Sequence, residues 1–486
     1  MPATLVGWID AVARAHARRP AAYGDGVAWT YDELWGRAGG IARHLLAERA
    51  LAPGDRIGIV GANEPAYLAA YLGILRAGCV AVPLNAMLSV AEMRDQLAHV
   101  GAACVIVGAD VPDGLEPAIA LRDLSVHGTG ALPRTSAGDP ACIFPTSGST
   151  GRPKGVVHTQ GSLLNMALLL AAALPFGPGE RSIAFLPFFA SAEQVLPALC
   201  TGAALDILPG FDPERIALAA RRGGTSFDAV PTVMARLLDQ APLEDLARLR
   251  WVSYASEPMP AALLRRWWDA LPGVPAHQFY GMTELVPVAI AEHRLQREQP
   301  STVGVPFPTT SIAVIDALGR DASEGELVVR SPAQMLGYHG DEATTAAVMT
   351  EDGAIRTGDL GRIDEHGRVF LTGRLKDLII SGGLNVAPAE IEAVACEHPG
   401  ILTAVVVGIP DERWGETPVV VAVPARGNGI AADDVLRHCR ESLTSFKRPS
   451  AAALVDALPS TGIGKSAKAV IRRRILDGEI ELVRAD

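Results

Sequence analysis

Residues 56–83, RIGIVGANEPAYLAAYLGILRAGCVAVP, carry the clearest pattern of alternating structure in this chain. A short apolar, β-branched run at 56–60 is followed by a helical pattern at 64–77 and by a second apolar run at 79–83. A strand, a crossover helix and another strand in this order predict two parallel strands of one sheet. The segment therefore indicates an α/β fold.

The same alternation extends over the N-terminal three quarters of the chain. Further helices are predicted at 5–18, 31–48 and 90–99, and further strands at 103–107, 182–186, 204–208, 227–230 and 249–252. After Gly304, short strands separated by Gly or charged turns predict an antiparallel sheet, at 311–316, 325–330, 361–364 and 368–372.

From residue 376 onward a smaller unit of mixed helices and strands is predicted, and its roughly 110 residues are enough for an independent domain. We therefore predict an α/β protein with two domains. The large N-terminal domain, residues 1–375, combines parallel α/β sheets with a small antiparallel sheet, and residues 376–486 form a small mobile α+β C-terminal domain.

Composition excludes several classes of protein. The 486 residues include 43 Lys+Arg and 54 Asp+Glu, which gives a net charge of −11 without a basic cluster, so nucleic-acid or anionic-membrane binding is unfavourable. The longest apolar run, 166–174, is about half of the ~20 residues that a membrane span needs. The six cysteines are scattered singly, and the N-terminus lacks a signal-peptide pattern, so we expect a cytoplasmic protein without disulfides or zinc.

The strongest local signal is FPTSGSTGRPKG, residues 144–155. Its hydroxyl side chains, glycines and lysine suit a loop that surrounds a polyphosphate. It is not a Walker A loop, because Pro153 stands where the second glycine of that motif belongs. A flexible linker is the alternative, but a linker needs no lysine and is usually longer. The candidate phosphate-binding residues are Thr146, Ser147, Gly148, Ser149, Thr150, Gly151 and Lys154.

This loop resembles the phosphate loop of the adenylate-forming enzymes, which include acyl-CoA and aryl-CoA synthetases, adenylation domains of peptide synthetases and luciferases. Further motifs follow in that family's order: YGMTE at 280–284, RTGD at 356–359, GRLKD at 373–377, the run 381–392, and Gly464-Lys465. The resemblance implies a reaction in two halves. A carboxylate attacks the α-phosphate of ATP and releases pyrophosphate, and a thiol, that of coenzyme A, then displaces AMP from the acyl-adenylate.

The resemblance also implies roles around the nucleotide. Thr283 would donate to the α-phosphate, and Glu284 would hold Mg²⁺, which prefers oxygen ligands. Asp359 would accept hydrogen bonds from the ribose hydroxyls, and Arg374 would add a positive charge beside them. By itself, the segment 357–359 is typical of a turn between strands. The other predicted nucleotide contacts are Ser256, Glu257, Pro258, Tyr280, Gly281 and Met282.

Three further segments would belong to the smaller domain and its hinge. Lys465 would bridge the carboxylate and the α-phosphate during adenylation, a task suited to an ammonium group on a flexible stem. Lys376 occupies the family's hinge position, about which the small domain would rotate between the two half-reactions. The turn Ser381-Gly382-Gly383 would then help to form the CoA tunnel.

Departures from the family pattern restrict the acid. Phe189 stands where amino-acid-activating domains place an aspartate, and Phe279 stands where malonate-type ligases carry an arginine. Ala190 replaces a common histidine. These residues favour an apolar fatty, cyclic or aryl acid, although the two phenylalanines could simply be core residues. The predicted acid-binding residues are Phe189, Ala190, Tyr254, Ala255, Gln278 and Phe279.

Two alternatives stay open at this point. The acyl group could be transferred to the phosphopantetheine of a carrier protein, since that thiol is chemically the same as the thiol of CoA. A non-catalytic nucleotide-binding regulator is the second alternative, although such a protein has no need for Lys465, Glu284 and Asp359 together. The expected partners are small molecules, and the chain is expected to be a monomer or a homodimer.

Overall fold

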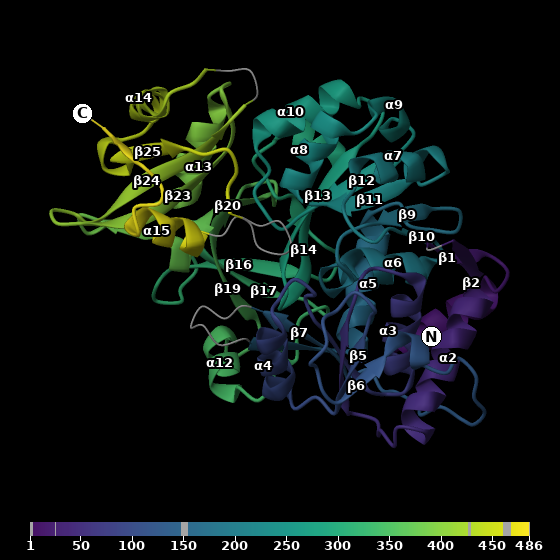
Figure 1. Cartoon of the computed structure of the whole chain (residues 1–486). Helices are drawn as coiled ribbons and strands as arrows, with labels where there is room; N and C mark the ends of the chain where they lie inside the picture. Colours follow the sequence, from purple (N-terminus) through teal and green to yellow (C-terminus); the bar gives the residue numbers. More distant parts are fainter. Residues whose placement is uncertain (1–2, 25, 147–153, 426–428, 460–467, 486) are drawn as a thin grey trace.

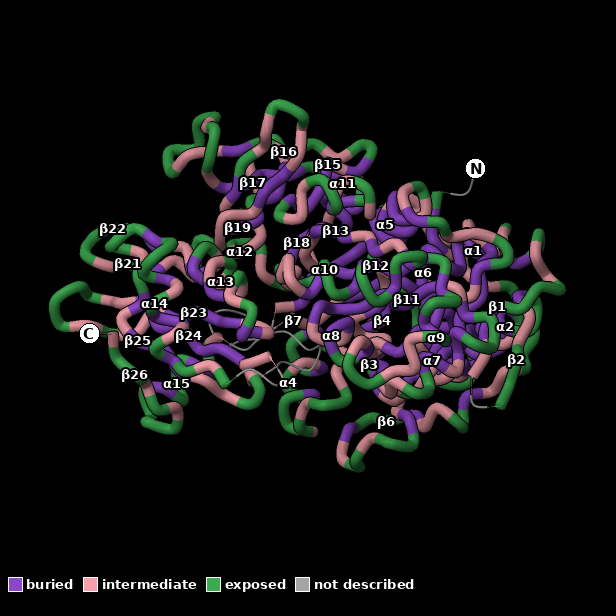
Figure 2. Tube along the Cα trace, turned by 90° about the horizontal axis from the view of Figure 1, so that it is seen from above, coloured by how far each residue is buried: buried purple, intermediate pink, exposed green. Residues whose placement is uncertain are grey.

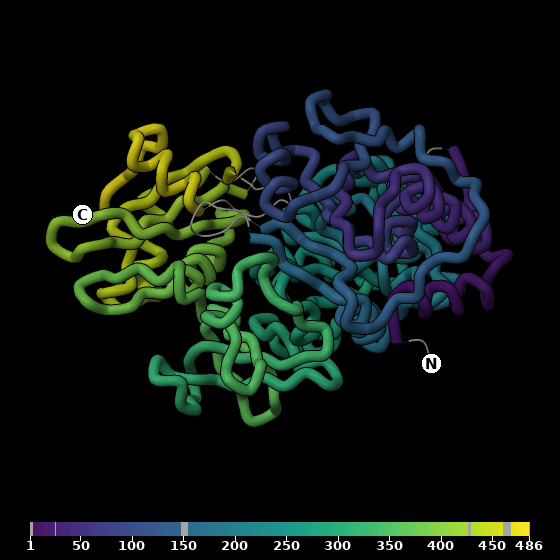
Figure 3. The backbone as a smooth tube through the Cα atoms, turned by 90° about the horizontal axis from the view of Figure 1, so that it is seen from below, coloured from purple at the N-terminus to yellow at the C-terminus, as the bar shows by residue number. Residues whose placement is uncertain are grey.

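The computed structural model describes residues 3–24, 26–146, 154–425, 429–459 and 468–485. Within these residues the strands form four sheets (Figure 1). The N-terminal and central parts of the chain build one large body, and the C-terminal residues build a smaller lobe beside it (Figure 3). The predicted fold class is confirmed.

The seven-stranded sheet contains the strand–helix–strand unit expected at residues 56–83. Strand β3 (Arg56–Val60) pairs in parallel with β4 (Val80–Pro83), and α3 (Pro65–Arg76) connects them. Beyond β4, the antiparallel hairpin of β7 (Pro140–Thr146) and β8 (Lys154–Thr159) places the two ends of the predicted phosphate loop side by side. The remaining strands of this sheet are β5 (Cys104–Val107), β6 (Ala118–Ala120) and β18 (Gly337–Tyr338).

The nine-stranded sheet supplies the strand ends that position the site. Its strands β9 (Arg181–Ala184), β11 (Ser226–Ala229), β12 (Trp251–Tyr254) and β13 (Ala276–Met282) are parallel neighbours, so their carboxyl ends share one edge. The other strands are β1 (Pro20–Gly24), β2 (Val27–Thr30), β10 (Ala204–Ile207), β14 (Leu285–Ala291) and β15 (Val305–Pro306). Ligands of open α/β sheets bind at such carboxyl edges.

Helices cover both large sheets and form the core between them. Figure 2 shows that burial is concentrated in this large body. The apolar run at 166–174 lies almost wholly within α5 (Gln160–Ala173), a buried core helix, and none of the described helices is long and apolar enough to cross a membrane. The other helices of this body are α1 (Leu5–Ala15), α2 (Tyr31–Ala47), α4 (Val90–Val100), α6 (Ala192–Thr201), α7 (Pro213–Arg221), α8 (Pro231–Gln240), α9 (Leu243–Leu246), α10 (Ala261–Ala270), α11 (His293–Glu298) and α12 (Glu342–Val348).

The antiparallel sheet corrects one local prediction. Its strands are β16 (Ser311–Ile315), β17 (Glu324–Arg330), β19 (Ile355–Ile363) and β20 (Val369–Arg374). Residues 357–359 lie inside β19 and do not form a turn between strands. The register with β17 shifts at this point, because Arg356 pairs with Val328 and Leu360 pairs with Glu326. On the other side Asp359 pairs with Arg374 of β20, and the Thr357 hydroxyl donates to the Leu327 carbonyl over 2.8 Å. Gly358, at φ 70°, bends the strand at this point and gave the misleading turn signal.

The C-terminal lobe has its own six-stranded sheet and its own apolar core. The strands are β21 (Ile379–Ser381), β22 (Leu384–Val386), β23 (Ile401–Asp411), β24 (Gly415–Pro424), β25 (Ala451–Leu454) and β26 (Val483–Arg484), and the helices are α13 (Pro388–Glu397), α14 (Ala432–Ser442) and α15 (Lys468–Leu476). The short 3-10 helix η3 (Leu375–Asp377) joins β20 to β21. The exact domain boundary at 375/376 stays a prediction.

Candidate active site

Two predicted phosphate-site residues lie at the paired ends of β7 and β8. Thr146 ends β7 and Lys154 begins β8, and the Thr146 hydroxyl donates to the Lys154 carbonyl over 3.4 Å. The loop residues between them, Ser147, Gly148, Ser149, Thr150 and Gly151, lie outside the described residues, as does Lys465. The roles assigned to those residues therefore stay predictions.

Tyr338 of β18 connects Lys154 with the predicted metal-binding carboxylate. The Lys154 ammonium lies 4.8 Å from the centre of the Tyr338 ring, a cation–π distance. The Tyr338 hydroxyl donates to Oε1 of Glu284 over 2.7 Å. Burial, with the Glu284 charge, raises the pKa of Tyr338, so this hydroxyl stays a neutral donor. Sequence reasoning missed Tyr338, because β18 lies far from both residues along the chain.

Thr283 lies between β13 and β14, and a buried histidine contacts its backbone. Nε2 of His158 lies 2.8 Å from the Thr283 carbonyl oxygen, and Nδ1 lies 3.1 Å from the Ser162 hydroxyl. Burial lowers the pKa of His158 to about 4, so the ring is neutral at ordinary pH. Since a carbonyl only accepts, Nε2–H must donate and Nδ1 must accept from Ser162. This fixed tautomer holds Thr283 in place.

The predicted ribose-binding carboxylate is buried between two partners. Asp359 is 2% exposed, and its Oδ2 accepts a 2.6 Å hydrogen bond from the Tyr280 hydroxyl. Arg374 Nε lies 2.6 Å from the other oxygen, Oδ1. Burial, reinforced by the Asp359 charge, raises the pKa of Tyr280 well above its usual range, so Tyr280 is a neutral donor. A carboxylate offers about four lone-pair directions, which leaves Asp359 capacity for ribose hydroxyls.

A cavity opens at the carboxyl ends of β9, β11 and β12. It has about 430 Å³ of empty space, part of it open to solvent. Three predicted acid-binding residues and one predicted nucleotide contact line it: Ala190, Ala255, Phe279 and Ser256. Its other lining residues are Leu186, Pro187, Glu193, Asp228, Ala229 and Val230. The structure thus brings together, at one edge, predicted residues that the sequence places up to 89 positions apart, Ala190 and Phe279.

The other predicted acid-binding residues lie elsewhere. Tyr254 and Gln278 are buried and share a hydrogen-bond network with Gln296, whose side-chain amide donates to the Gln278 carbonyl oxygen over 3.0 Å and to the Tyr254 hydroxyl. Phe189 belongs to the 3-10 helix η2 (Phe188–Ala190) and is only partly buried. None of these three residues lines the cavity.

Ser256 has a backbone conformation that side chains rarely adopt. Its φ is 79°, in the left-handed region, where it follows β12 and lines the cavity. Glu257 and Pro258 continue this segment, while Gly281 and Met282 end β13. Strain of this kind is concentrated at ligand sites, where the surrounding structure fixes the backbone.

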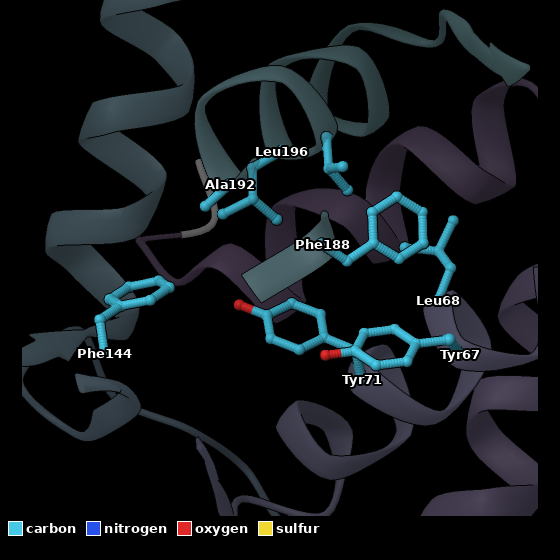
Figure 4. A pocket seen from close by; sticks show the side chains of 8 residues that line it. Tyr67, Leu68, Tyr71, Phe144, Phe188, Ala192 and Leu196 are labelled. Atoms are coloured by element: carbon cyan, nitrogen blue, oxygen red, sulfur yellow. The ribbon is translucent and has the colours of Figure 1, made fainter. Parts of the chain in front are cut away.

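A second, apolar pocket lies behind η2. It has about 330 Å³ of empty space, part of it open to solvent, and Figure 4 shows Phe188 on one side of it and Tyr67 and Tyr71 of α3 on the other. The Phe188 and Tyr67 rings lie 5.4 Å apart between their centroids. The remaining lining residues are Leu68, Phe144, Ala192, Val195 and Leu196. The short η2–α6 segment therefore separates two cavities.

The predicted hinge and CoA segments occupy the junction with the C-terminal lobe. Lys376 lies exposed in η3, between the two parts of the chain. Gly382 and Gly383, with φ of 60° and 81°, form the two-residue turn of the β21–β22 hairpin that follows Ser381. Positive φ at both positions is typical of a type I′ turn and explains the glycine pair.

Comparison with known proteins agrees with this arrangement. Residues 9–339 match the AMP-binding enzyme family, and residues 390–465 match the AMP-binding enzyme C-terminal domain. A feruloyl-CoA synthase of an Amycolatopsis species is 34% identical over 97% of this chain and 99% of its own. The long-chain-fatty-acid–CoA ligase FadD13 of Mycobacterium tuberculosis is 30% identical over 88% of this chain and 90% of its own.

A solved structure gives the same result. The crystal structure of ATP-bound MatB from Rhodopseudomonas palustris matches with a TM-score of 0.88 at 30% identity and covers 98% of this chain and 99% of the other. The chain therefore belongs to the AMP-binding enzyme family. It is an AMP-forming acid–CoA ligase that uses ATP and coenzyme A.

Proposed function

We propose that this ligase activates an apolar acid, with an aryl or cyclic skeleton preferred, as its acyl-adenylate and transfers the acyl group to coenzyme A. One observation carries the proposal. Ala190, Ala255 and Phe279 converge on a single cavity at the carboxyl edge of the parallel strands, beside Ser256. The similarity to a feruloyl-CoA synthase over nearly the whole chain supports an aryl acid, and the similarity to FadD13 keeps fatty acids as the alternative.

The roles proposed for the described residues follow from their contacts. Lys154 would bind the departing pyrophosphate, and Thr283, fixed by His158, would donate to the α-phosphate. Asp359 would accept from the ribose hydroxyls. Glu284, oriented by its hydrogen bond from Tyr338, is a suitable oxygen ligand for Mg²⁺, which neutralises phosphate charge when bound.

We propose that the two half-reactions use two positions of the C-terminal domain. Residues 1–375 would form the N-terminal domain and residues 376–486 the mobile one, with Lys376 as the hinge. Lys465 would reach the α-phosphate during adenylation, and the Ser381–Gly383 turn would replace it for CoA transfer. The exposed position of Lys376 in a three-residue helix between two strands supports this hinge.

ATP–pyrophosphate exchange with a panel of aryl, cyclic and fatty acids tests the proposed substrate class. We expect exchange with apolar acids and little with amino acids or malonate. Exchange that is fastest with amino acids or malonate contradicts the proposal. A carrier-protein acceptor is tested by supplying holo-carrier protein in place of CoA, with faster acyl transfer to the carrier contradicting CoA as the acceptor.

The role of Lys465 has its own test. Lys465→Ala should lose about 10²–10³-fold in adenylation, by analogy with removing a key transition-state donor, while CoA transfer from supplied acyl-adenylate is mostly retained. Lys447→Ala is a matched control, because Lys447 is paired with Glu390 over 2.6 Å. Equal losses in both half-reactions contradict the role of Lys465.

The hinge role of Lys376 is tested separately. Lys376→Pro should impair one half-reaction and spare the other.

We propose a cytoplasmic location from the substrates of the reaction and from the state of the cysteines. ATP and coenzyme A are cytoplasmic substrates of the proposed chemistry, and all six cysteines are free thiols, five of them buried. Free thiols are typical of a reducing compartment.

A further inference from the structure

Two carboxylate side chains lie in the wall of the otherwise mostly apolar acid cavity. Asp228 lies near the carboxyl end of β11, and Glu193 lies in the first turn of α6. Neither was expected from the sequence as an acid-binding residue. Asp228 is 8% exposed, and its strand position pairs with Ser253 of β12, so the fold fixes it firmly at the cavity.

One oxygen of Asp228 is unpartnered. The Ser253 side chain and the Ala229 backbone hydrogen bond to this carboxyl group, yet within the described part of the chain Oδ1 has no hydrogen-bond partner. Buried polar atoms without a partner are rare and costly. Burial, with the negative charge of Glu193, raises the pKa of Asp228 to about 8, so the group is mostly protonated at neutral pH. Asp228 lines the cavity, and its unpartnered Oδ1 is buried in the cavity wall, so this carboxyl group has unused hydrogen-bonding capacity for a ligand.

We propose that the acid substrate carries a hydrogen-bond donor, a hydroxyl or an amino group remote from its carboxylate, and that Asp228 binds this donor. The inference rests on the proposed function and adds a polar group to the apolar skeleton proposed there. Apolar lining residues such as Val230 and Phe279 would contact the carbon skeleton of the substrate, while Asp228 would hydrogen-bond to its donor group.

The negative charge of Glu193 favours a hydrogen-bond donor over an acceptor as the substituent of the substrate. A protonated carboxyl group can donate as well as accept, so Asp228 alone would tolerate a carbonyl or ether oxygen. Glu193 lines the same cavity, and its negative charge attracts the positive end of an O–H or N–H bond and repels an electron-rich oxygen. A second carboxylate on the substrate is excluded for the same reason.

A set of matched acids provides the test. The probes are 3-arylpropanoates whose para position carries a hydroxyl, an aminomethyl, a methyl or a methoxy group, and the readout is kcat/KM for ATP–pyrophosphate exchange. The proteins are the full-length wild type, Asp228→Leu and Asp228→Asn. Asp245→Asn is the matched control, because Asp245 is also 8% exposed but lies on α9, outside the cavity lining.

We expect the wild type to prefer a donor-bearing acid over the methyl acid by about 10- to 100-fold, the range for a hydrogen bond to a buried polar group. Asp228→Leu should reduce this ratio to near unity while methyl-acid activity persists. Asp228→Asn keeps a neutral acceptor, as the mostly protonated Asp228 of the wild type is, so it should retain the preference for the hydroxyl acid over the methyl acid. Asp245→Asn should keep the wild-type ratios.

Three results would overturn the inference: equal wild-type rates for the hydroxyl, aminomethyl and methyl acids, a preference for the methoxy acid, or a ratio that Asp228→Leu leaves unchanged. The wild-type panel decides the first two even if Asp228→Leu fails to fold. Failure of the proposed function has a different signature, because no apolar acid would then support exchange at all.

Discussion

The Tyr280 hydroxyl donates a 2.6 Å hydrogen bond to Oδ2 of Asp359, joining β13 of the nine-stranded sheet to β19 of the antiparallel sheet. Asp359 is 2% exposed, and a buried carboxyl group needs such hydrogen bonds in place of water, so this bond fixes the orientation of its side chain. The bond would therefore orient Asp359 for its proposed contact with the ribose before the nucleotide binds.

Removing this hydroxyl should weaken nucleotide binding. Tyr280→Phe is expected to raise the Kd for AMP about 10-fold, as befits the loss of a hydrogen bond to a charged group. Asp359→Asn should cost more, because it also removes the ion pair with Arg374. Isothermal titration calorimetry with AMP measures both, and an unchanged Kd for Tyr280→Phe would show that the bond does not serve the nucleotide.

Tyr338 has two contacts that substitution can separate. Tyr338→Phe keeps the ring beside Lys154 but removes the hydroxyl bound to Glu284, so the Mg²⁺ concentration for half-maximal exchange should rise about 10-fold. Tyr338→Leu removes the ring as well and should also raise the KM for ATP by a few-fold, the size of a cation–π contact. Magnesium titrations at saturating ATP, and ATP titrations at saturating magnesium, distinguish the two effects. Identical behaviour of both variants would contradict the division of roles.

His158 should act by position and not by protonation. His158→Ala is expected to lower kcat for adenylation about 10-fold, because the Thr283 carbonyl loses its donor, and His158→Gln should recover part of the loss through its amide N–H. The pH–rate profiles of wild type and His158→Gln should coincide between pH 6 and 8, since the pKa of His158 is about 4. His366→Ala, at an exposed histidine, is the control. A wild-type ionisation near pH 6.5 that disappears in His158→Gln would refute this role.

Much of the fold was readable from local patterns. Strand β3 occupies the predicted residues 56–60, and α3 and β4 follow within one residue of their expected bounds. Strong periodicity and apolar β-branched runs report local preferences directly. The segment 357–359 was misread because Gly358 favours a turn by itself, whereas its flanking residues Arg356 and Leu360 pair with β17 and Asp359 pairs with β20, which holds the segment in β19.

The site was readable only where a motif names its residues. Lys154 and Glu284 stand in short recognisable segments, whereas Tyr338, which contacts both, is brought to them by long-range strand pairing. Asp228 gave no sequence signal, because an aspartate in a short strand segment is ambiguous until the cavity beside it is known. Burial and convergence are properties of the three-dimensional arrangement and leave no local pattern.

Ser256 should tolerate glycine better than its neighbour does. At φ 79° a side chain costs about 1–2 kcal/mol, which glycine avoids, although glycine adds about 0.5–1 kcal/mol of chain entropy to the unfolded state. Ser256→Gly is therefore expected to be as stable as wild type or up to about 1 kcal/mol more stable in urea unfolding. Ala255→Gly, outside the left-handed region, should lose about 0.5–1 kcal/mol. Equal destabilisation by both changes would contradict strain at Ser256.

The buried carboxyl group of Asp228 should make stability depend on pH. Its pKa is raised from 3.8 to about 8, by burial and by the charge of Glu193, so between these values the folded state holds a proton that the unfolded state has released. Raising the pH therefore favours unfolding: this contribution to stability is fully present below pH 3.8 and is lost as the pH rises through about 8.

Asp228→Asn has no such proton. The difference in free energy of unfolding, Asp228→Asn minus wild type, should therefore increase as the pH rises from 5 to 8, by up to about 1.4 kcal/mol per pH unit. Urea unfolding at pH 5, 6, 7 and 8 measures the difference. Glu193→Gln should shift the upper end of this window to lower pH, because it removes a neighbouring negative charge. Asp245→Asn is the control for replacing a buried aspartate elsewhere. A constant difference between Asp228→Asn and wild type across this range would mean that Asp228 is already ionised in the folded protein.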